Sequence, residues 1–130
     1  MMPSTRTVSL ALKATAVINI VAALGALVAP ALHAELMYSP GTEFSGLTLR
    51  FHIIIWAFVL AMGVGYAIAA RDPERQTALL ASAALGKLAV AVLWIEMLAS
   101  GYGAWLLLAG VCWDGALGAL FAVYLWGRAR

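Results

Sequence analysis

The chain has 130 residues, of which 65% are hydrophobic and only 11% are charged. A soluble domain is about a quarter charged, so this composition excludes an ordinary soluble fold and predicts an integral membrane protein. The net charge of +2 is small and its basic residues are scattered, so we expect no nucleic-acid partner. The single cysteine, Cys112, cannot form an internal disulfide, and we expect it to serve only in packing.

Four apolar runs account for most of the chain, and each is near the ~20 residues that a helix needs to cross a bilayer. They predict helices over roughly residues 8–31, 47–70, 73–99 and 104–126. The predicted fold class is therefore all-α. We expect a single integral membrane domain, residues 1–130, folded as a four-transmembrane-helix bundle that runs up-down-up-down.

The first run ends at Pro30, because proline cannot continue a helical hydrogen-bond ladder. Its basic start and the sequence "APALHA" are also compatible with a cleavable signal peptide, but we expect the segment to be retained as the first span. The only long connection follows, "HAELMYSPGTEFSG", in which Pro40, Gly41 and Gly46 are typical turn residues.

The second run has a small residue at every fourth position. These are Ala57, Ala61, Gly65 and Ala69. Such a stripe favours close packing against a neighbouring helix. Before the third run, Asp72 is a good N-cap and Pro73 suits the first helical position, so we expect that helix to begin at Pro73. The sequence "SGYG" then predicts a tight hairpin to the fourth helix, where Gly110 and Gly118 flank Asp114.

The basic residues predict the orientation of the bundle. Six of them fall on one side of four spans: Arg6, Lys13, Arg71, Arg75, Arg128 and Arg130. The opposite side has Arg50 alone. Because loops rich in lysine and arginine stay inside, both termini are predicted to be cytoplasmic. The expected location is the membrane, as a multi-pass protein of the bacterial inner membrane.

Three polar residues lie at matched depth in the predicted bundle. Lys87, Asp114 and Asn19 are each about ten or eleven residues into a helix, or about 15 Å at 1.5 Å per residue. An isolated charge there costs at least about 2.5–3.5 kcal/mol. We therefore expect Lys87 to pair with Asp114, with Asn19 as their neutral neighbour. The pair could be structural, it could handle protons or a ligand, or the lysine could instead snorkel or face a partner chain.

A second polar layer is predicted near the outer surface. Arg50 and His52 open the second helix, and Glu96 closes the third. The long connection adds His33, Glu35 and Glu43. Arg50 and Glu96 are at matched depth and could pair, and His52 is expected to be a polar anchor at the interface. The spacing of these residues matches no known metal motif, so we expect no metal and no cofactor.

The sequence "GYAIAARDPERQTALLASAALGK", residues 65–87, is followed by an acidic residue in "DGALGALFAVYLW", which starts at Asp114. This pattern resembles small four-helix bacterial membrane proteins of the DoxX-like kind, many of them uncharacterised. The resemblance covers the last three helices. It implies a fold and no particular activity.

We expect a non-enzymatic membrane subunit or a hydrophobic-ligand-binding protein. A four-helix bundle has few buried positions, so its charged layer must face its own interior or another subunit. The expected partners are therefore membrane lipid, a hydrophobic small molecule, and further copies of the chain or a larger membrane complex.

Two alternatives stay open. One is a proton-coupled small-molecule transporter that uses Asp114 and Lys87. The small multidrug transporters have this size, but their key glutamate lies in the first helix, where this chain has only Asn19. The other is an intramembrane isomerase-type enzyme with Glu96, His52 and Arg50 as acid, base and electrostatic partner, although two of these lie near the membrane edge.

Overall fold

The structure is a computed structural model that describes residues 2–130, and in this range it is helical without strands. Its elements are α1 (Thr5–Val28), α2 (Pro30–Met37), α3 (Gly46–Ala69), the 3₁₀ turn η1 (Pro73–Arg75), α4 (Thr77–Ala99) and α5 (Trp105–Arg128). The four long helices, α1, α3, α4 and α5, are each long and apolar enough to cross a membrane. The predicted all-α, four-span architecture is confirmed.

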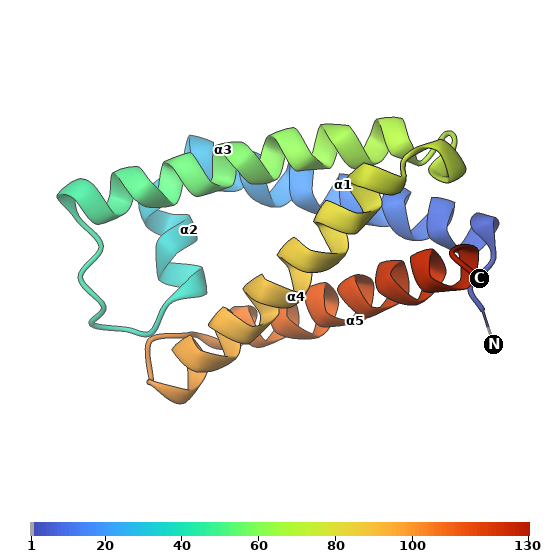
Figure 1. Ribbon diagram of the computed structural model, residues 1–130. Coiled ribbons are helices and arrows are strands. Elements are labelled where there is room, and N and C mark those ends of the chain that lie inside the picture. Colours follow the sequence, from blue (N-terminus) through green and yellow to red (C-terminus); the bar gives the residue numbers. More distant parts are fainter. Residues whose placement is uncertain (1) are drawn as a thin grey trace.

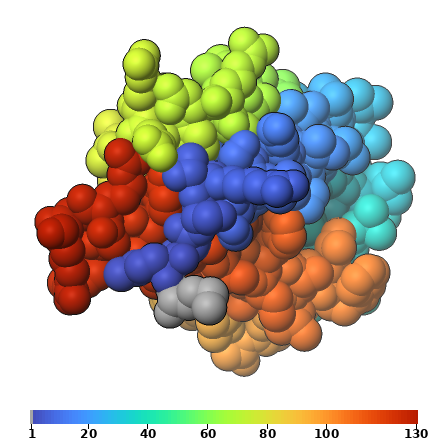
Figure 2. Space-filling view, turned by 90° about the vertical axis from the view of Figure 1, so that its right-hand side faces the viewer, coloured from blue at the N-terminus to red at the C-terminus, as the bar shows by residue number. Residues whose placement is uncertain are grey.

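The two ends of the bundle differ (Figure 1). Both termini and η1 lie at one end, here called the terminal end. The short helix α2, residues 38–45 and the α4–α5 turn lie at the other, here called the loop end. Along the bundle, α1 packs against α3 and α4 packs against α5. Figure 2 looks onto the terminal end and shows the start of α1 between the end of α5 and the α3–α4 connection.

The beginning and end of α1 have local causes. The Ser4 side chain accepts a hydrogen bond from the Thr7 backbone N–H and caps the helix at its start. The helix ends at Val28, and Pro30 is the first residue of α2. The expected span to residue 31 is therefore too long. The predicted turn-rich loop is also wrong in its first part, because residues 33–37 belong to the helix α2. Proline suits a first helical position, and good helix formers follow Pro30.

The predicted start of the third span is wrong as well. Pro73 begins the separate turn η1, and α4 starts only at Thr77. Asp72 makes no side-chain capping bond; its carboxylate lies 3.2 Å from the Arg75 Nε in an exposed ion pair. The other two spans begin and end within two residues of the predicted positions, because their boundaries are marked by glycine and by charge.

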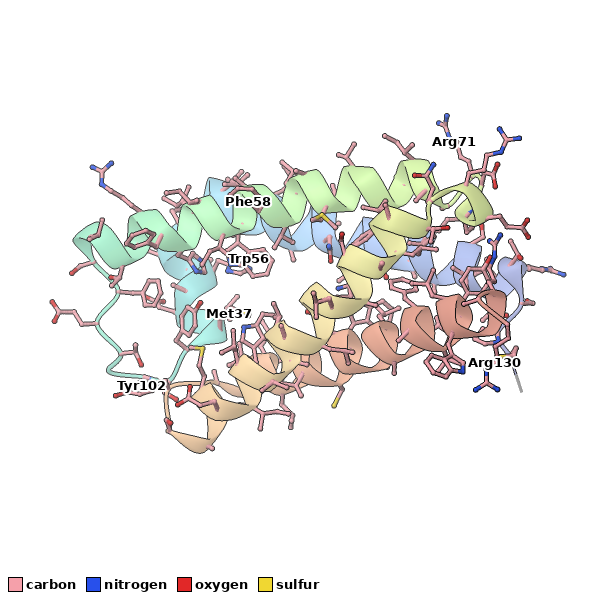
Figure 3. The ribbon with its side chains drawn as sticks, viewed as in Figure 1. Met37, Trp56, Phe58, Arg71, Tyr102 and Arg130 are labelled. Atoms are coloured by element: carbon pink, nitrogen blue, oxygen red, sulfur yellow. The ribbon has the colours of Figure 1, made fainter. Side chains whose placement is uncertain are left out.

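The apolar core falls into two clusters. The cluster toward the terminal end includes the buried side chains of Leu12, Tyr66, Leu80 and Phe121, one from each long helix. The cluster toward the loop end is centred on Ala23, Ala26, Met37, Trp56 and Leu107. In Figure 3, Trp56 points from α3 into the bundle, whereas Phe58 points away from it. Lys87 and Asp114, the charged midplane residues, belong to neither cluster.

Small residues allow close helix contacts at fewer positions than the stripe on α3 predicts. Ala57 and Ala61 are exposed, and only Ala69 of the stripe is buried. The close approach of α3 to α1 occurs instead at Gly63, where an added Cβ would lie 2.9 Å from Ile20 Cγ1.

On α5 the prediction for two glycines is confirmed. A Cβ added at Gly110 would overlap the Trp94 ring, and one at Gly118 would lie 2.7 Å from Leu88 Cγ. Cys112, expected to be packed, is exposed on the face of α5 that turns away from its neighbours.

Candidate functional site

The midplane layer contains the predicted ion pair. Lys87 Nζ on α4 donates a hydrogen bond to Asp114 Oδ1 on α5, which confirms the pairing inferred from depth. The two side chains are only 8% and 14% exposed. Gly110 and Gly118, one turn on either side of Asp114, bring α5 close enough to α4 for this contact. The charges therefore neutralise each other within one pair of antiparallel helices.

The neutral neighbour of this pair is different from the predicted one. Within residues 2–130, the Asn19 side chain makes no hydrogen bond to Lys87 or Asp114, and it lies at the contact of α1 with Gly63. The ring of Tyr66, from α3, lies instead 5.8 Å from Lys87 Nζ. A cation at this distance from a ring face is attracted by its quadrupole. Tyr66 is thus the contact of the pair with the α1–α3 half of the bundle.

Trp113 adds an unusual polar group to the same part of α5. Its ring packs against the terminal-end cluster, and its indole Nε1 is the one fully buried side-chain nitrogen or oxygen without a hydrogen-bond partner in residues 2–130. An indole N–H can only donate. Leaving such a group buried and unpaired costs about 1–3 kcal/mol. The layer therefore contains a donor that lacks an acceptor within the described chain.

The loop end brings two histidines together. His33 on α2 and His52 on α3 lie 3.2 Å apart, measured from Nδ1 to Nε2, and the Tyr38 hydroxyl lies 3.4 Å from His52 Nδ1. The Phe44 ring packs edge-on against the His52 ring, and the Trp56 ring packs against it in a tilted orientation. His52 is 2% exposed, so the expectation of an interfacial anchor is wrong. The fold-back of α2 onto α3 is what buries it.

Burial shifts the pKa values of His33 and Tyr38, the two titratable groups of this cluster that lie outside the long helices. It lowers the pKa of His33 below its ordinary value of 6.5, because a charged imidazole loses hydration there. The same desolvation raises the pKa of the Tyr38 phenol above 10.0. Both groups are therefore held in their neutral forms, which suits a hydrogen bond between two imidazoles in which one donates and the other accepts.

The other predicted loop-end residues do not join this cluster. Arg50 is exposed and forms no ion pair with Glu96 in the described part of the chain; Glu96 accepts a hydrogen bond from the Ser100 hydroxyl at 2.8 Å. The pairing that their matched depth allows therefore does not form, because depth alone does not set the side of a helix on which a residue lies. No set of three or more His, Cys, Asp or Glu residues between positions 2 and 130 could hold a metal ion.

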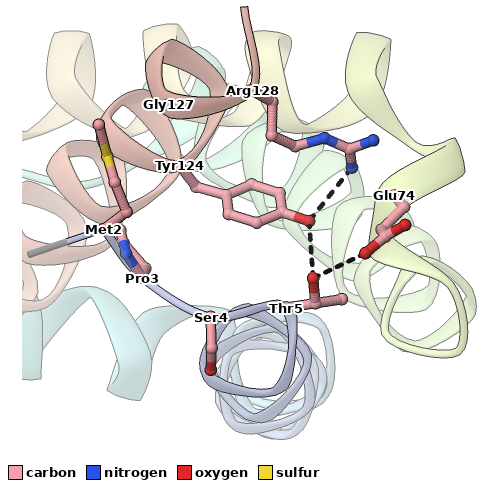
Figure 4. A pocket seen from close by; sticks show the side chains of 8 residues that line it. All are labelled: Met2, Pro3, Ser4, Thr5, Glu74, Tyr124, Gly127 and Arg128. Atoms are coloured by element: carbon pink, nitrogen blue, oxygen red, sulfur yellow. Dashed lines mark hydrogen bonds between the residues drawn. The ribbon is translucent and has the colours of Figure 1, made fainter. Parts of the chain in front are cut away.

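A third polar site lies at the terminal end, in a cavity of about 460 Å³ (Figure 4). Arg128 donates a hydrogen bond to the Tyr124 hydroxyl at 3.2 Å, this hydroxyl lies 3.4 Å from that of Thr5, and Thr5 donates to Glu74 Oε1 at 2.8 Å. Each hydroxyl can accept from one side and donate to the other, so the chain of bonds connects a cation to a carboxylate. It joins α5, α1 and η1.

No protein-family model, no curated protein and no solved structure matches this chain significantly. The DoxX-like resemblance therefore stays a prediction.

Three contacts of these sites have partners that residue spacing does not reveal. Tyr66 beside Lys87, the His33–His52 contact and the Thr5–Tyr124 link join residues that are far apart in the chain. A signal was present for one of them. His33 and His52 both lie on the outer side of the predicted topology, which places the two imidazoles at the same end of the bundle.

Proposed function

We propose that this chain is a non-enzymatic, multi-pass protein of the bacterial inner membrane that binds a hydrophobic small molecule at the midplane layer. The ligand carries a hydrogen-bond acceptor such as a carbonyl oxygen. The observation that carries the proposal is the buried, unpaired Nε1–H of Trp113. In hydrocarbon no water can pair with this donor, so an acceptor on a bound molecule gains the full value of satisfying it.

The position of Trp113 supports the same proposal. It lies about 12 Å along α5 from Trp105 and next to Asp114, at the edge of the terminal-end cluster against which its ring packs. Ligand sites in small bundles form between facing helices, with mostly apolar walls and few polar groups. In the proposed site the apolar residues around the Lys87–Asp114 pair form these walls, and Trp113 supplies the polar group.

The alternatives receive less support from the geometry. An isomerase-type site needs an acid and a base within reach of one substrate, whereas Glu96 is exposed and bonded to Ser100 while His52 is buried against His33. A proton-coupled transporter needs charged groups that open to both sides in turn. Lys87 and Asp114 are instead closed onto each other within one helix pair.

The test uses a probe with a single acceptor. A fluorescent naphthyl alkyl ketone is titrated into the purified protein in detergent, beside a hydrocarbon analogue that lacks the carbonyl. The wild type should bind the ketone saturably. Trp113→Phe keeps an aromatic ring but removes the N–H, and should weaken binding about five- to tenfold, the value of one hydrogen bond.

The matched control is Trp105→Phe, which alters an exposed tryptophan at the start of the same helix. It should bind the ketone as the wild type does. The proposal fails if the wild type shows no saturable binding, or if ketone and hydrocarbon bind equally well to all three proteins. A loss of oligomeric mass in Trp113→Phe, without any change in ketone binding, would show that a neighbouring subunit supplies the acceptor.

A further inference from the structure

A cavity of about 470 Å³ at the loop end, here called the loop-end pocket, is lined by one face of α2, by residues 38–42 and by Phe44. Its helical wall is one face of α2 and the C-cap residue Tyr38, because Ala31, Ala34, Glu35 and Tyr38 recur at spacings of three and four. The volume lies within the roughly 300–1,000 Å³ of small-molecule sites. The pocket is at the opposite end of the molecule from the hydrogen bonds that link Arg128 to Glu74, and it lies outside the midplane layer.

The opposite wall of the pocket is fixed in place. The Ser39 backbone N–H donates to the Tyr102 carbonyl at 2.9 Å, and the Ser39 hydroxyl donates to the Gly103 carbonyl at 3.1 Å. These bonds attach the loop to the α4–α5 turn. Tyr38 and Phe44 also line the pocket, and their rings stack with centroids 4.6 Å apart and an angle of 11° between the ring planes. The walls are therefore preorganised, which reduces the entropy lost on binding.

The chemistry of the walls favours a cation. Glu35 is exposed and has no ion pair or side-chain hydrogen bond in residues 2–130, so its carboxylate is free to act as a counter-ion. The loop end as a whole carries three glutamates, Glu35, Glu43 and Glu96, against Arg50. Aromatic rings add the attraction of a negative π-face for alkylated ammonium groups, which are weakly hydrated. An anion would meet repulsion and no free donor on this helix face.

We propose that the loop-end pocket binds an organic ammonium group, with the Glu35 carboxylate as counter-ion and the stacked Tyr38 and Phe44 rings as the apolar wall. The group comes either from a free quaternary ammonium compound such as choline or from the primary ammonium of a phospholipid ethanolamine headgroup. The inference is independent of the ligand proposed for the midplane layer, because the two sites share no residue.

The first arm of the experiment tests the free cation. Choline and its neutral isostere 3,3-dimethylbutan-1-ol are titrated by ligand-observed NMR into the full-length protein in phospholipid-free detergent. Choline should bind at least about fivefold tighter than the alcohol. Glu35→Gln and Phe44→Leu should each weaken choline binding about two- to fivefold. Glu43→Gln, a loop carboxylate outside the pocket lining, should leave it unchanged.

The second arm tests the lipid source. Native mass spectrometry compares retention of phosphatidylethanolamine and phosphatidylglycerol by the same four proteins. Preferential retention of the ethanolamine lipid, reduced in Glu35→Gln and retained in Glu43→Gln, supports the site with a lipid headgroup as its occupant. Choline binding with the stated pattern supports it with a free cation. Equal affinity for choline and the alcohol, together with no lipid preference, overturns the proposal.

Discussion

An isolated charge on Lys87 or Asp114 would raise the free energy of the folded protein in the membrane, and the ion pair between them offsets much of this cost. Their contact is the one that sequence depth predicts, and it joins α4 to α5. Removing one partner strands the other as a buried charge, which costs roughly 3–5 kcal/mol. Lys87→Met and Asp114→Leu should therefore each lower the melting temperature in detergent.

The double variant distinguishes this explanation from independent effects. Lys87→Met with Asp114→Leu leaves no unpaired charge, so it should recover much of the lost stability. A strictly additive loss would contradict the pairing. If stability returns but ketone binding does not, the pair also serves the ligand.

The contact between His33 and His52 predicts that the stability of the folded protein depends on pH. Burial lowers the pKa of His33, so the folded protein binds this proton less readily than the unfolded chain does. The folded protein is therefore most stable, with respect to this group, above pH 6.5, where His33 is neutral in both states. Its stability falls as the pH drops below 6.5 toward the lower pKa of His33 in the folded state. A second charge on His52, 3.2 Å away, would add repulsion in the same direction.

The measurement is the melting temperature between about pH 7.5 and about pH 5, where histidine titrates. The wild type should lose several degrees over this interval, and His33→Gln should lose less. Because the chain has only two histidines, His33→Gln with His52→Gln provides the background due to carboxylates. Equal slopes for the wild type and this double variant would rule out a contribution from the pair.

Helix packing predicts opposite effects for two glycines on the α4–α5 pair. An added Cβ at Gly118 would lie 2.7 Å from Leu88 Cγ and 3.2 Å from the Ala84 carbonyl oxygen, whereas one at Gly86 would meet nothing within 4 Å. Gly118→Ala should lower stability by about 1–3 kcal/mol, through overpacking of a close contact. Gly86→Ala should be neutral or stabilise α4 by up to about 1 kcal/mol, since alanine is the better helix former.

Thermal unfolding followed by circular dichroism in detergent compares the two variants directly. Because both add one methyl group to a helical glycine of the same helix pair, differences in propensity cancel. Equal melting temperatures would show that α4 and α5 do not approach as closely at Gly118 as the structure has it.

At the scale of the whole molecule, the asymmetry between the two ends predicts an orientation. The terminal end carries the termini, Arg71 and Arg75, whereas the loop end carries Arg50 and three glutamates. By the positive-inside rule a reporter fused after Arg130 should be cytoplasmic. A reporter inserted near Gly41 should face the outside. The paired fusions are scored with one reporter active only inside and one active only outside, and inverted activities would overturn the orientation.

The sequence alone determined the number of spans and their approximate lengths, because a bilayer imposes both on any apolar helix. It also determined the Lys87–Asp114 pair. In adjacent antiparallel helices, depth is a linear function of residue number, and two isolated opposite charges at one depth have strong reason to meet.

Only the tertiary structure decided which side of each helix faces which neighbour. The long helices are apolar nearly all round, so their sequences carry no amphipathic pattern to specify rotation about the axis. For this reason Tyr66 rather than Asn19 lies beside Lys87, and Arg50 and Glu96 stay apart. The His33–His52 contact required one further event, the fold-back of α2 after Pro30, which no local pattern specifies. It depends on burying Met37 and Trp56 in one cluster, a free-energy gain that exists only once the helices are assembled.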